Sequence, residues 1–406
     1  MSQLTPNSSK TYCPLLFQHL ATHPFGGVSQ CCIAYHSYSI GTYPDGSTRY
    51  YNLAKDSIQD IMNSDSLKAA RVQSLNGEWP STCKRCTDDE NAGVESKRQF
   101  ELKSYPDFTY EKARSITNYD GHIDDIQFDF IELRLGNTCN VKCVMCNPYS
   151  SSKWYGDFAE IKKAVSWDYG RFELEDHQFK WPERDEVWED IFNHCKNIKT
   201  IYINGGEPTL NKQHKTFLNM LIDKGLTDVE LRYNINMTRL PKDFIEIWKN
   251  FKNVNVGCSI DDLAERNYYI RYPTVWKDVL NNLDKIVNNG FKFNITQTIN
   301  WINYCTVGDF YQFFVEKYGE HVVVIHNPVF FPHYLSPHVL PTEIKDRAHE
   351  KFASQLDSRR LDSITKTFNK PFDDAAWSKA KEYVTSLDKI RNVNFLDYFP
   401  EFKGYV

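Results

Sequence analysis

Three cysteines in one short run are the residues best suited to chemistry in this 406-residue chain. Cys139, Cys143 and Cys146 follow the segment 128–135, which alternates apolar and polar residues as a strand does. Thiolates hold iron–sulfur clusters, and four of them are needed to complete a [4Fe–4S] cubane. Three thiolates therefore leave one iron open to bind another molecule. The alternatives are buried cysteines or structural zinc, but zinc takes four ligands, usually in paired CxxC or Cys/His spacings.

The CxxxCxxC spacing of this run resembles that of the radical SAM superfamily. The resemblance implies that the open iron chelates the amino and carboxylate groups of S-adenosylmethionine (SAM). It also implies that the reduced cluster splits the sulfonium and releases a 5′-deoxyadenosyl radical. A second match follows the next predicted strand, where Gly205-Gly206-Glu207-Pro208 resembles the GGEP motif that binds the methionyl amino group. Glycines let backbone carbonyls approach a cation closely, and Glu207 adds a carboxylate.

Weaker matches follow the third and fourth predicted strands. The segment 235–238 (INMT) resembles the family's TNGT, with isoleucine and methionine at two of its positions. The segment 258–262 (CSIDD) resembles the SxDG pattern, with an aspartate in place of the glycine. The resemblance gives as candidate SAM contacts Asn236, Ser259, Asp261 and Met145. Asp261 could equally contact substrate or cap a helix, and Met145, at the position that packs on adenine, could be plain packing.

The order of predicted elements favours an α/β fold. Six short apolar strands alternate with amphipathic helices, which predicts a parallel sheet with its active site at the carboxyl ends of the strands. The expected strands are 131–135, 200–204, 229–235, 254–260, 291–298 and 322–325, and expected helices include 217–224, 244–250 and 275–288. We predict a partial (β/α)6 TIM-like barrel of the radical SAM type. The predicted domains are an auxiliary iron–sulfur domain over 1–124, the radical SAM core over 125–335 and a helical C-terminal extension over 336–406.

Two further segments have a distinct pattern. In the predicted N-terminal domain, apolar residues recur at helical spacing over 56–74 and predict one helix. Between the cluster motif and the second strand, the connection 147–198 is long and rich in aromatic residues. Long connections in compact domains are usually functional or carry their own structure. We expect part of it, around Trp154–Phe158, to cover the substrate cavity, with a surface insertion as the alternative.

A second cysteine set lies in the N-terminal zone. Its pattern of Cys13, Gly26, Cys31 and then Cys83-x2-Cys86 resembles the first half of the SPASM pattern. Later SPASM cysteines are absent after Cys86, which resembles the shorter twitch type with one auxiliary [4Fe–4S] cluster. These domains normally follow the barrel, whereas this one precedes it. The ligands implied are Cys13, Cys31, Cys83 and Cys86, with Cys32 as an alternative to Cys31; a zinc ion held by the same thiolates is the competing interpretation. Four thiolates leave no open iron, which suits electron transfer.

Composition limits the cellular compartment and the binding partners that we expect. A net charge of −5 gives no broad footprint for nucleic acid or anionic membrane. No charged-then-apolar leader and no long apolar run is present, so we expect a cytoplasmic protein. Eleven cysteines in an unexported chain favour metal ligation over disulfides. Cys195 and Cys258 lie in apolar patterns and are expected to be buried.

The net reaction is less constrained, because the cofactor does the difficult chemistry and the protein selects the hydrogen atom. We expect hydrogen abstraction from a C–H bond of a small polar or nucleotide-sized molecule, with a peptide as the alternative substrate. The resulting product would be oxidised, rearranged or cross-linked. A non-catalytic iron–sulfur redox protein is a third interpretation. Weak candidates for substrate contact are Cys305, Arg134 and His326, and the electron donor would be a flavodoxin or ferredoxin.

Overall fold

The computed structural model describes residues 10–34, 38–174, 176–368 and 371–406. The chain forms two compact units. The first contains residues 1–137, 174–233 and 246–254, and the second contains 138–173, 234–245 and 255–406. None of the described helices is long and apolar enough to cross a membrane.

The first unit is built on a mostly parallel sheet. Strand β5 (Phe130–Arg134) pairs in parallel with β6 (Thr200–Asn204), and β6 pairs in parallel with β7 (Glu230–Ile235). On its other side β5 pairs in parallel with β1 (His19–Thr22), and β1 pairs antiparallel with β2 (Val28–Ser29). The N-terminal zone thus adds two strands that the sequence analysis did not predict. A separate hairpin is formed by β3 (Ile40–Thr42) and β4 (Thr48–Tyr50).

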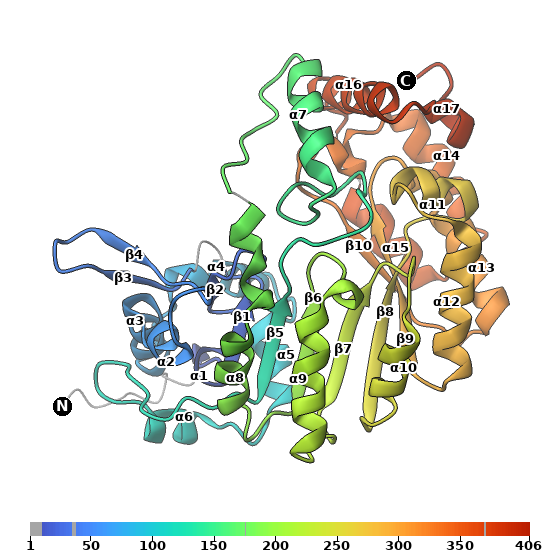
Figure 1. Cartoon of the computed structure of the whole chain (residues 1–406). Helices are drawn as coiled ribbons and strands as arrows, with labels where there is room; N and C mark the ends of the chain where they lie inside the picture. Colours follow the sequence, from blue (N-terminus) through green and yellow to red (C-terminus); the bar gives the residue numbers. More distant parts are fainter. Residues whose placement is uncertain (1–9, 35–37, 175, 369–370) are drawn as a thin grey trace. The chain divides into compact units, whose positions relative to one another are not determined.

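Helices surround the strands of the first unit. Alternate residues of β5, β6 and β7 are fully buried aliphatic or aromatic side chains, and α9 packs there through a hydrogen bond of 2.7 Å between His214 Nε2 and Tyr233 Oη. Helices α8 and α9 lie side by side (Figure 1). The helices of this unit are α1 (Leu15–Gln18), α2 (Ile58–Met62), α3 (Asp65–Leu75), α4 (Lys84–Asn91), α5 (Lys97–Ser104), α6 (Tyr110–Ile116), α8 (Asp185–Asn193) and α9 (Lys212–Asp223), with short 3-10 turns η2 (Ser81–Cys83), η3 (Asp176–Glu183) and η4 (Pro208–Leu210).

The prediction of one helix over 56–74 is wrong in one respect. The segment is interrupted at Ser64, whose backbone is extended (ψ 153°), so that α2 and α3 are separate helices. The physical reason is a side chain that pairs with a neighbouring segment. The Asn63 amide donates to the Ile123 carbonyl at 3.0 Å and its oxygen accepts from the Ile123 N–H at 3.0 Å.

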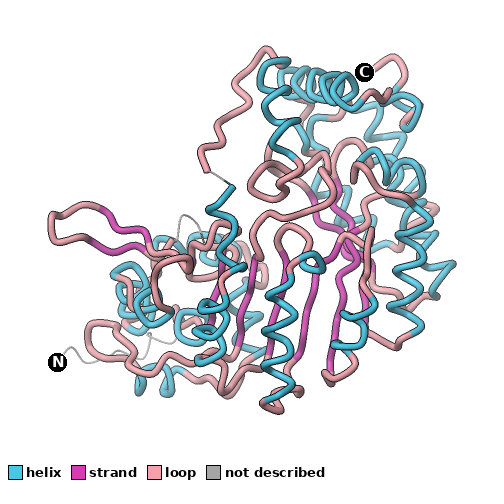
Figure 2. Tube along the Cα trace, in the orientation of Figure 1, coloured by secondary structure: helices cyan, strands magenta, loops and turns pink. Residues whose placement is uncertain are grey.

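The second unit contains the remaining parallel strands. Strand β9 (Lys292–Ile299) pairs in parallel with both β8 (Asn253–Ser259) and β10 (Val324–Pro328), and the three are seen side by side in Figure 2. Helices α11 (Ala264–Ile270), α12 (Trp276–Asn288) and α13 (Val307–Tyr318) alternate with these strands along the chain. The predicted α/β fold is therefore confirmed, with the six predicted strands displaced at their ends by no more than about three residues.

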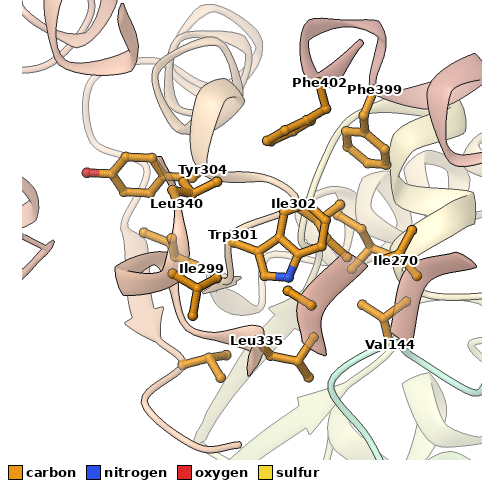
Figure 3. Packing of buried hydrophobic residues seen from close by; sticks show 14 of the residues in the cluster. Val144, Ile270, Ile299, Trp301, Ile302, Tyr304, Leu335, Leu340, Phe399 and Phe402 are labelled. Carbon is orange, nitrogen blue, oxygen red and sulfur yellow. The ribbon is translucent and has the colours of Figure 1, made fainter. Parts of the chain in front are cut away.

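The C-terminal zone is helical, as predicted. Its helices are α14 (Thr342–Phe352), α15 (Ser358–Phe368), α16 (Asp374–Arg391) and α17 (Phe395–Tyr398). They share a large hydrophobic core with the loop after β9 and with α7 (Trp154–Ala164). Figure 3 shows this core, in which Trp301 lies near Val144 and Phe402. Val144 belongs to the loop 139–146 that carries the three cysteines, here called the cluster loop, and Phe402 belongs to the C-terminal turn η8 (Pro400–Phe402). Short turns η5 (Tyr304–Thr306), η6 (His333–Leu335) and η7 (Pro337–Val339) also belong to this unit, and α10 (Lys242–Trp248) contributes to both units.

Candidate active site

The three cysteines of the CxxxCxxC run lie on a loop of the second unit. Cys139 and Cys143 are 7% and 3% exposed, and Cys146 is half-buried. The thiols of Cys143 and Cys146 are within hydrogen-bonding distance, and this contact, together with the Arg271 guanidinium and despite burial, lowers the pKa of Cys143. Three shielded thiols beside a fixed cation fit the cysteine ligation of an iron–sulfur cluster. Within the described part of the chain no three His, Cys, Asp or Glu side chains converge on a single metal-sized point.

Arg271 lies directly opposite Cys143. The Lys142 N–H donates to the Tyr272 carbonyl at 2.6 Å and the Val144 N–H donates to the Ile270 carbonyl at 2.8 Å. These two bonds hold the segments that carry Cys143 and Arg271 against each other. Accordingly, Arg271 Nη1 lies 4.0 Å from Cys143 Sγ.

The carboxylate of Asp261, in the SxDG-like segment, forms an ion pair with Arg271. Its Oδ2 lies 2.7 Å from Arg271 Nε, an ion-pair contact rather than a well-aligned hydrogen bond, and its Oδ1 accepts from the Thr298 N–H at 2.7 Å. Burial lowers the pKa of Arg271, but Asp261 and the Cys143 thiolate more than offset it, so the pKa lies above its ordinary value. The geometry therefore favours a role for Asp261 that the sequence did not suggest, namely holding Arg271.

Asn236, expected to contact SAM, also reaches the cluster loop. Its Nδ2 donates to Asn140 Oδ1 at 2.8 Å and lies 3.8 Å from Cys139 Sγ, and its Oδ1 accepts from the Thr238 N–H at 3.0 Å. The next residue, Met237, has φ 60°. Glycine adopts this left-handed backbone without strain and methionine does not, which explains why the TNGT pattern has glycine there.

Three consecutive carbonyls of the loop accept hydrogen bonds from side chains outside it. The Lys142 carbonyl accepts from Arg391 Nη2 at 2.8 Å, the Cys143 carbonyl from Trp154 Nε1 at 2.9 Å, and the Val144 carbonyl from Tyr383 Oη at 2.7 Å. Arg391 and Tyr383 belong to α16 and Trp154 begins α7. The C-terminal extension and the start of the 147–198 connection therefore fix the conformation of the cluster loop.

The connection 147–198 is divided between the two units. Trp154 is fully buried in the core beneath the cluster loop, and its side chain cannot cover a cavity. Tyr155 and Phe158 are half-buried and contact Phe172, with ring centroids 5.5 and 6.3 Å apart. The lid stays a prediction, and these two side chains are its candidates. Residues 174–198 pack within the first unit, where Trp181 Nε1 donates to the Pro24 carbonyl at 3.0 Å.

The GGEP segment ends β6 in the first unit. Gly205 and Gly206 have φ 83° and 54°, and a Cβ on Gly205 would lie 2.8 Å from the Arg134 Cα. Only glycine fits this close approach of two strand ends. Glu207 is buried, and its Oε1 accepts from the Thr209 hydroxyl at 2.7 Å and from the Thr209 N–H at 3.2 Å. The motif is thus built as a rigid turn with a preorganised carboxylate.

Four N-terminal cysteines line one cavity in the first unit. Cys13 precedes α1, Cys31 follows β2, Cys83 ends η2 and Cys86 lies in α4. The thiols affect one another electrostatically: burial and neighbouring thiols raise the pKa of Cys13, Cys31 and Cys83 above the ordinary value. Four thiols on one cavity that repel as thiolates, with Cys86 buried and the other three half-buried, are chemically suited to a bound cationic centre, which fits the auxiliary cluster that the resemblance implies.

Cys32 does not line that cavity. Its thiol is hydrogen-bonded to Glu132 of β5, and burial and then Glu132 raise the pKa of Cys32 to about 12. Cys31 and Cys32 lie in a turn, in which the Ala34 N–H donates to the Cys31 carbonyl at 3.3 Å, and their two thiols face different surroundings. The geometry therefore favours Cys31 over Cys32 as the fourth auxiliary ligand. On the Cys32 side, Glu132 lies 3.6 Å from Arg134, between the Oε1 and Nη2 atoms.

The remaining candidates have varied surroundings. His326 Nδ1 lies 2.9 Å from Gln297 Oε1, and Gln297 Nε2 donates to the Asp261 carbonyl at 3.0 Å, so a polar chain joins β10, β9 and the end of β8. Burial lowers the pKa of His326 to about 4, which keeps the imidazole neutral. Ser259 ends β8 half-buried and Met145 packs against the core. Cys305 lies in η5 against the same core, while Cys195 and Cys258 are fully buried.

Sequence reasoning missed Arg271, Tyr383 and Arg391. No spacing marks them, because each reaches the cluster loop from a segment far away in the sequence.

Comparisons with known proteins agree with this site. Residues 133–314 match the model of the radical SAM superfamily, and residues 13–87 match the SPASM model, an iron–sulfur cluster-binding domain. No curated protein sequence matches the chain.

Several solved structures are similar in fold. The structure titled native anSMEcpe with bound AdoMet is 18% identical over 58% of this chain and 62% of that chain, with a TM-score of 0.40. Streptococcus suis SuiB bound to precursor peptide SuiA is 13% identical over 88% of this chain and 70% of that chain, with a TM-score of 0.35. TYW1 with a lysine–pyruvate adduct bound is 17% identical over 58% of this chain and 73% of that chain, with a TM-score of 0.30. The chain spans less than two thirds of the length of the anSMEcpe chain.

Together, the parallel α/β fold, the cysteine loop and the two family matches show that the chain contains a radical SAM domain and, before it, a SPASM-type iron–sulfur domain. The two domains imply SAM and two iron–sulfur clusters as cofactors.

Proposed function

We propose that this enzyme cleaves SAM reductively and abstracts a hydrogen atom from a C–H bond of its substrate. When bound, the cluster and SAM supply a 5′-deoxyadenosyl radical for that abstraction. Cys139, Cys143 and Cys146 would hold the SAM-binding cluster, and the single observation that carries the proposal is their shielded loop, braced on three successive carbonyls. Glu207, Gly205 and Gly206 would bind the methionyl amino group, and Ser259 would contact SAM.

The N-terminal cysteines have a further task in this proposal. Cys13, Cys31, Cys83 and Cys86 would hold the auxiliary cluster with no iron left open, which suits that cluster to accept an electron from the substrate. An oxidation of this kind removes a hydrogen atom, an electron and a proton from the substrate, and the proton would pass to solvent, so that charge and atoms balance.

The surface of the second unit favours a peptide over the small polar substrate that the sequence analysis preferred. Strand β10 pairs with β9 and, among the described residues, with no other strand of its unit. Apolar side chains along and beyond it are exposed: Val323 by 51%, Ile325 by 41% and Phe331 by 87%. An open strand edge flanked by exposed apolar side chains is typical of sites that bind an extended peptide.

The test uses transfer of deuterium into 5′-deoxyadenosine. Reconstituted enzyme, dithionite and SAM are incubated anaerobically with size fractions of an extract from the producing organism grown in deuterated medium. We expect deuterium in 5′-deoxyadenosine with fractions that contain peptides, and loss of the transfer after protease treatment. Transfer only from protease-resistant small molecules would contradict the peptide, and no 5′-deoxyadenosine with any fraction would contradict the function itself.

A further inference from the structure

The pairing of Cys143 with Arg271 has a consequence for the chemistry of the loop. Backbone hydrogen bonds join Lys142 to Tyr272 and Val144 to Ile270, so the segments that carry the two side chains are held against each other. Its Nη1 lies 4.0 Å from Cys143 Sγ. Arg271 is 8% exposed, and a buried charge is screened by salt much less than a surface charge.

Other side chains hold the guanidinium in place. Asp261 is fully buried and lies 2.7 Å from Arg271 Nε. Asp261 is itself held by the Thr298 N–H at 2.7 Å, and its own N–H donates to Asn267 Oδ1 at 3.1 Å. A guanidinium held at one end by a carboxylate directs its other N–H groups toward a second acceptor. Here the second acceptor is the sulfur of Cys143.

We propose that Arg271 sets the reduction potential of the cluster held by Cys139, Cys143 and Cys146, an inference that rests on the proposed function. Reduction adds one electron to the cluster from an external donor, which loses one electron, and no bond forms or breaks. The added negative charge is stabilised by a nearby fixed cation and by N–H groups directed at sulfur, two of the known determinants of cluster potentials. Asn236, whose Nδ2 lies 3.8 Å from Cys139 Sγ, is a second donor of this kind.

Asp261 gives the inference a prediction of opposite sign. Its carboxylate positions the guanidinium but also offsets part of its charge. Replacing Asp261 by asparagine should keep an acceptor for Arg271 and remove the negative charge, so reduction becomes easier. Replacing Arg271 by glutamine removes the positive charge, so reduction becomes harder. If Asp261 and Arg271 only supported the fold, both substitutions would change the protein in the same direction, because both would cause loss of the cluster.

The experiment is a redox titration of reconstituted protein without SAM or substrate, followed by electron paramagnetic resonance, with iron content measured for each variant. At a fixed ambient potential we expect R271Q to lower the reduced-to-oxidised ratio of the cluster at least tenfold, which is about 59 mV for a one-electron couple. R271K, which keeps the charge but loses the planar fork, should shift by less. D261N should shift in the opposite direction.

Arg266 provides the matched control. It lies on α11, five residues before Arg271, and forms a two-contact pair with Glu401 at 2.6 and 3.1 Å. R266Q should leave the potential unchanged. An unchanged potential in R271Q at wild-type iron content would overturn the inference, as would an equal shift in R266Q. If R271Q retains no iron, R271K and D261N decide, and shifts of the same sign in these two would also overturn it. Since no SAM is present, the outcome is independent of whether the enzyme cleaves SAM.

Discussion

Arg391, the last residue of α16, and Asp157, in α7, form a buried ion pair with 3.0 Å between Nε and Oδ2. The same guanidinium donates to the Lys142 carbonyl of the cluster loop at 2.8 Å, and Lys142 Nζ lies 2.5 Å from Asp157 Oδ1. The contacts of Arg391, Asp157 and Lys142 thus join the cluster loop to α7 and α16. Loss of Arg391 would leave Asp157 paired with Lys142 alone and would remove the donor to the Lys142 carbonyl.

We therefore expect R391Q to reduce the free energy of unfolding by about 1–3 kcal/mol, because the Lys142 carbonyl loses a donor while Asp157 keeps Lys142 as a partner. It should also speed the loss of iron from the SAM-binding cluster to a chelator, because the loop that carries its ligands loses a contact. Urea unfolding and timed iron release measure the two effects. K366Q is the control, since its ion pair with Asp362 is exposed and such pairs contribute at most about 1 kcal/mol. Equal stability of R391Q and K366Q would contradict the bracing role.

The phenol of Tyr383 gives a smaller and more local test. Y383F removes the donor to the Val144 carbonyl and leaves the ring packed against Tyr334, at a centroid distance of 5.0 Å. A buried carbonyl that loses its partner costs about 1–3 kcal/mol. We expect destabilisation of this size together with faster iron loss. Unchanged iron release in a destabilised Y383F would show that the hydrogen bond supports the fold but not the loop.

The two neighbouring cysteines of the auxiliary site should behave differently. C31S should lose about four of about eight irons per chain, since each cubane holds four. C32S should keep them, because the Cys32 thiol contacts Glu132 and does not line the cysteine cavity. Iron and acid-labile sulfide analysis decides between the two. Loss of the auxiliary iron in C32S with retention in C31S would reverse the ligand assignment.

The carboxylate of the GGEP turn should matter for SAM rather than for iron. E207Q keeps a hydrogen-bond acceptor for Thr209 but removes the charge that would face the SAM ammonium. A charge-assisted hydrogen bond contributes about 1.5–3 kcal/mol, so SAM affinity should fall about tenfold or more. Equilibrium dialysis with labelled SAM measures this, with T209V as a control that alters the turn but keeps the charge. Equal affinity of E207Q and wild type would mean that Glu207 has only its capping role.

His214 predicts a pH dependence of stability. Burial lowers its pKa to about 3, while an unfolded histidine has a pKa near about 6.5. As pH falls below that unfolded value, the unfolded state binds the proton and the folded state does not, so stability decreases, by up to about 1.4 kcal/mol per pH unit. H214Q should show a shallower decrease between pH 7.5 and 5.5 in urea unfolding. An identical slope would show that other groups carry the dependence.

Much of the fold was predictable from the sequence because strand and helix periods are local. The six parallel strands were found since buried parallel strands form short apolar runs, and the cysteine and GGEP motifs follow such strands directly. Strand β1 was missed because its pairing with β5 is a contact between residues more than a hundred positions apart. The break at Ser64 was missed for the same reason, since Asn63 pairs with Ile123.

The candidate active site also has some residues that the sequence indicates and others that only the structure reveals. The cysteines that we propose as cluster ligands could be chosen from the sequence, because residue type and spacing are the signal for such ligands. Arg271, Tyr383 and Arg391 were not, because each is an ordinary residue whose role comes from where the chain returns to the cluster loop. The assignment of Cys31 over Cys32 likewise needed the structure, since only the direction of each side chain distinguishes two adjacent cysteines.

The most direct test of the central claim is formation of 5′-deoxyadenosine by two cluster-specific variants compared with wild type. Each protein is reconstituted anaerobically, its iron is counted, and it is incubated with dithionite and SAM. We expect wild type to form 5′-deoxyadenosine, C143A to form none while retaining the auxiliary iron, and C83A to retain SAM cleavage. Undiminished 5′-deoxyadenosine from C143A, or none from fully loaded wild type, would contradict the assignment of this loop as the radical SAM centre.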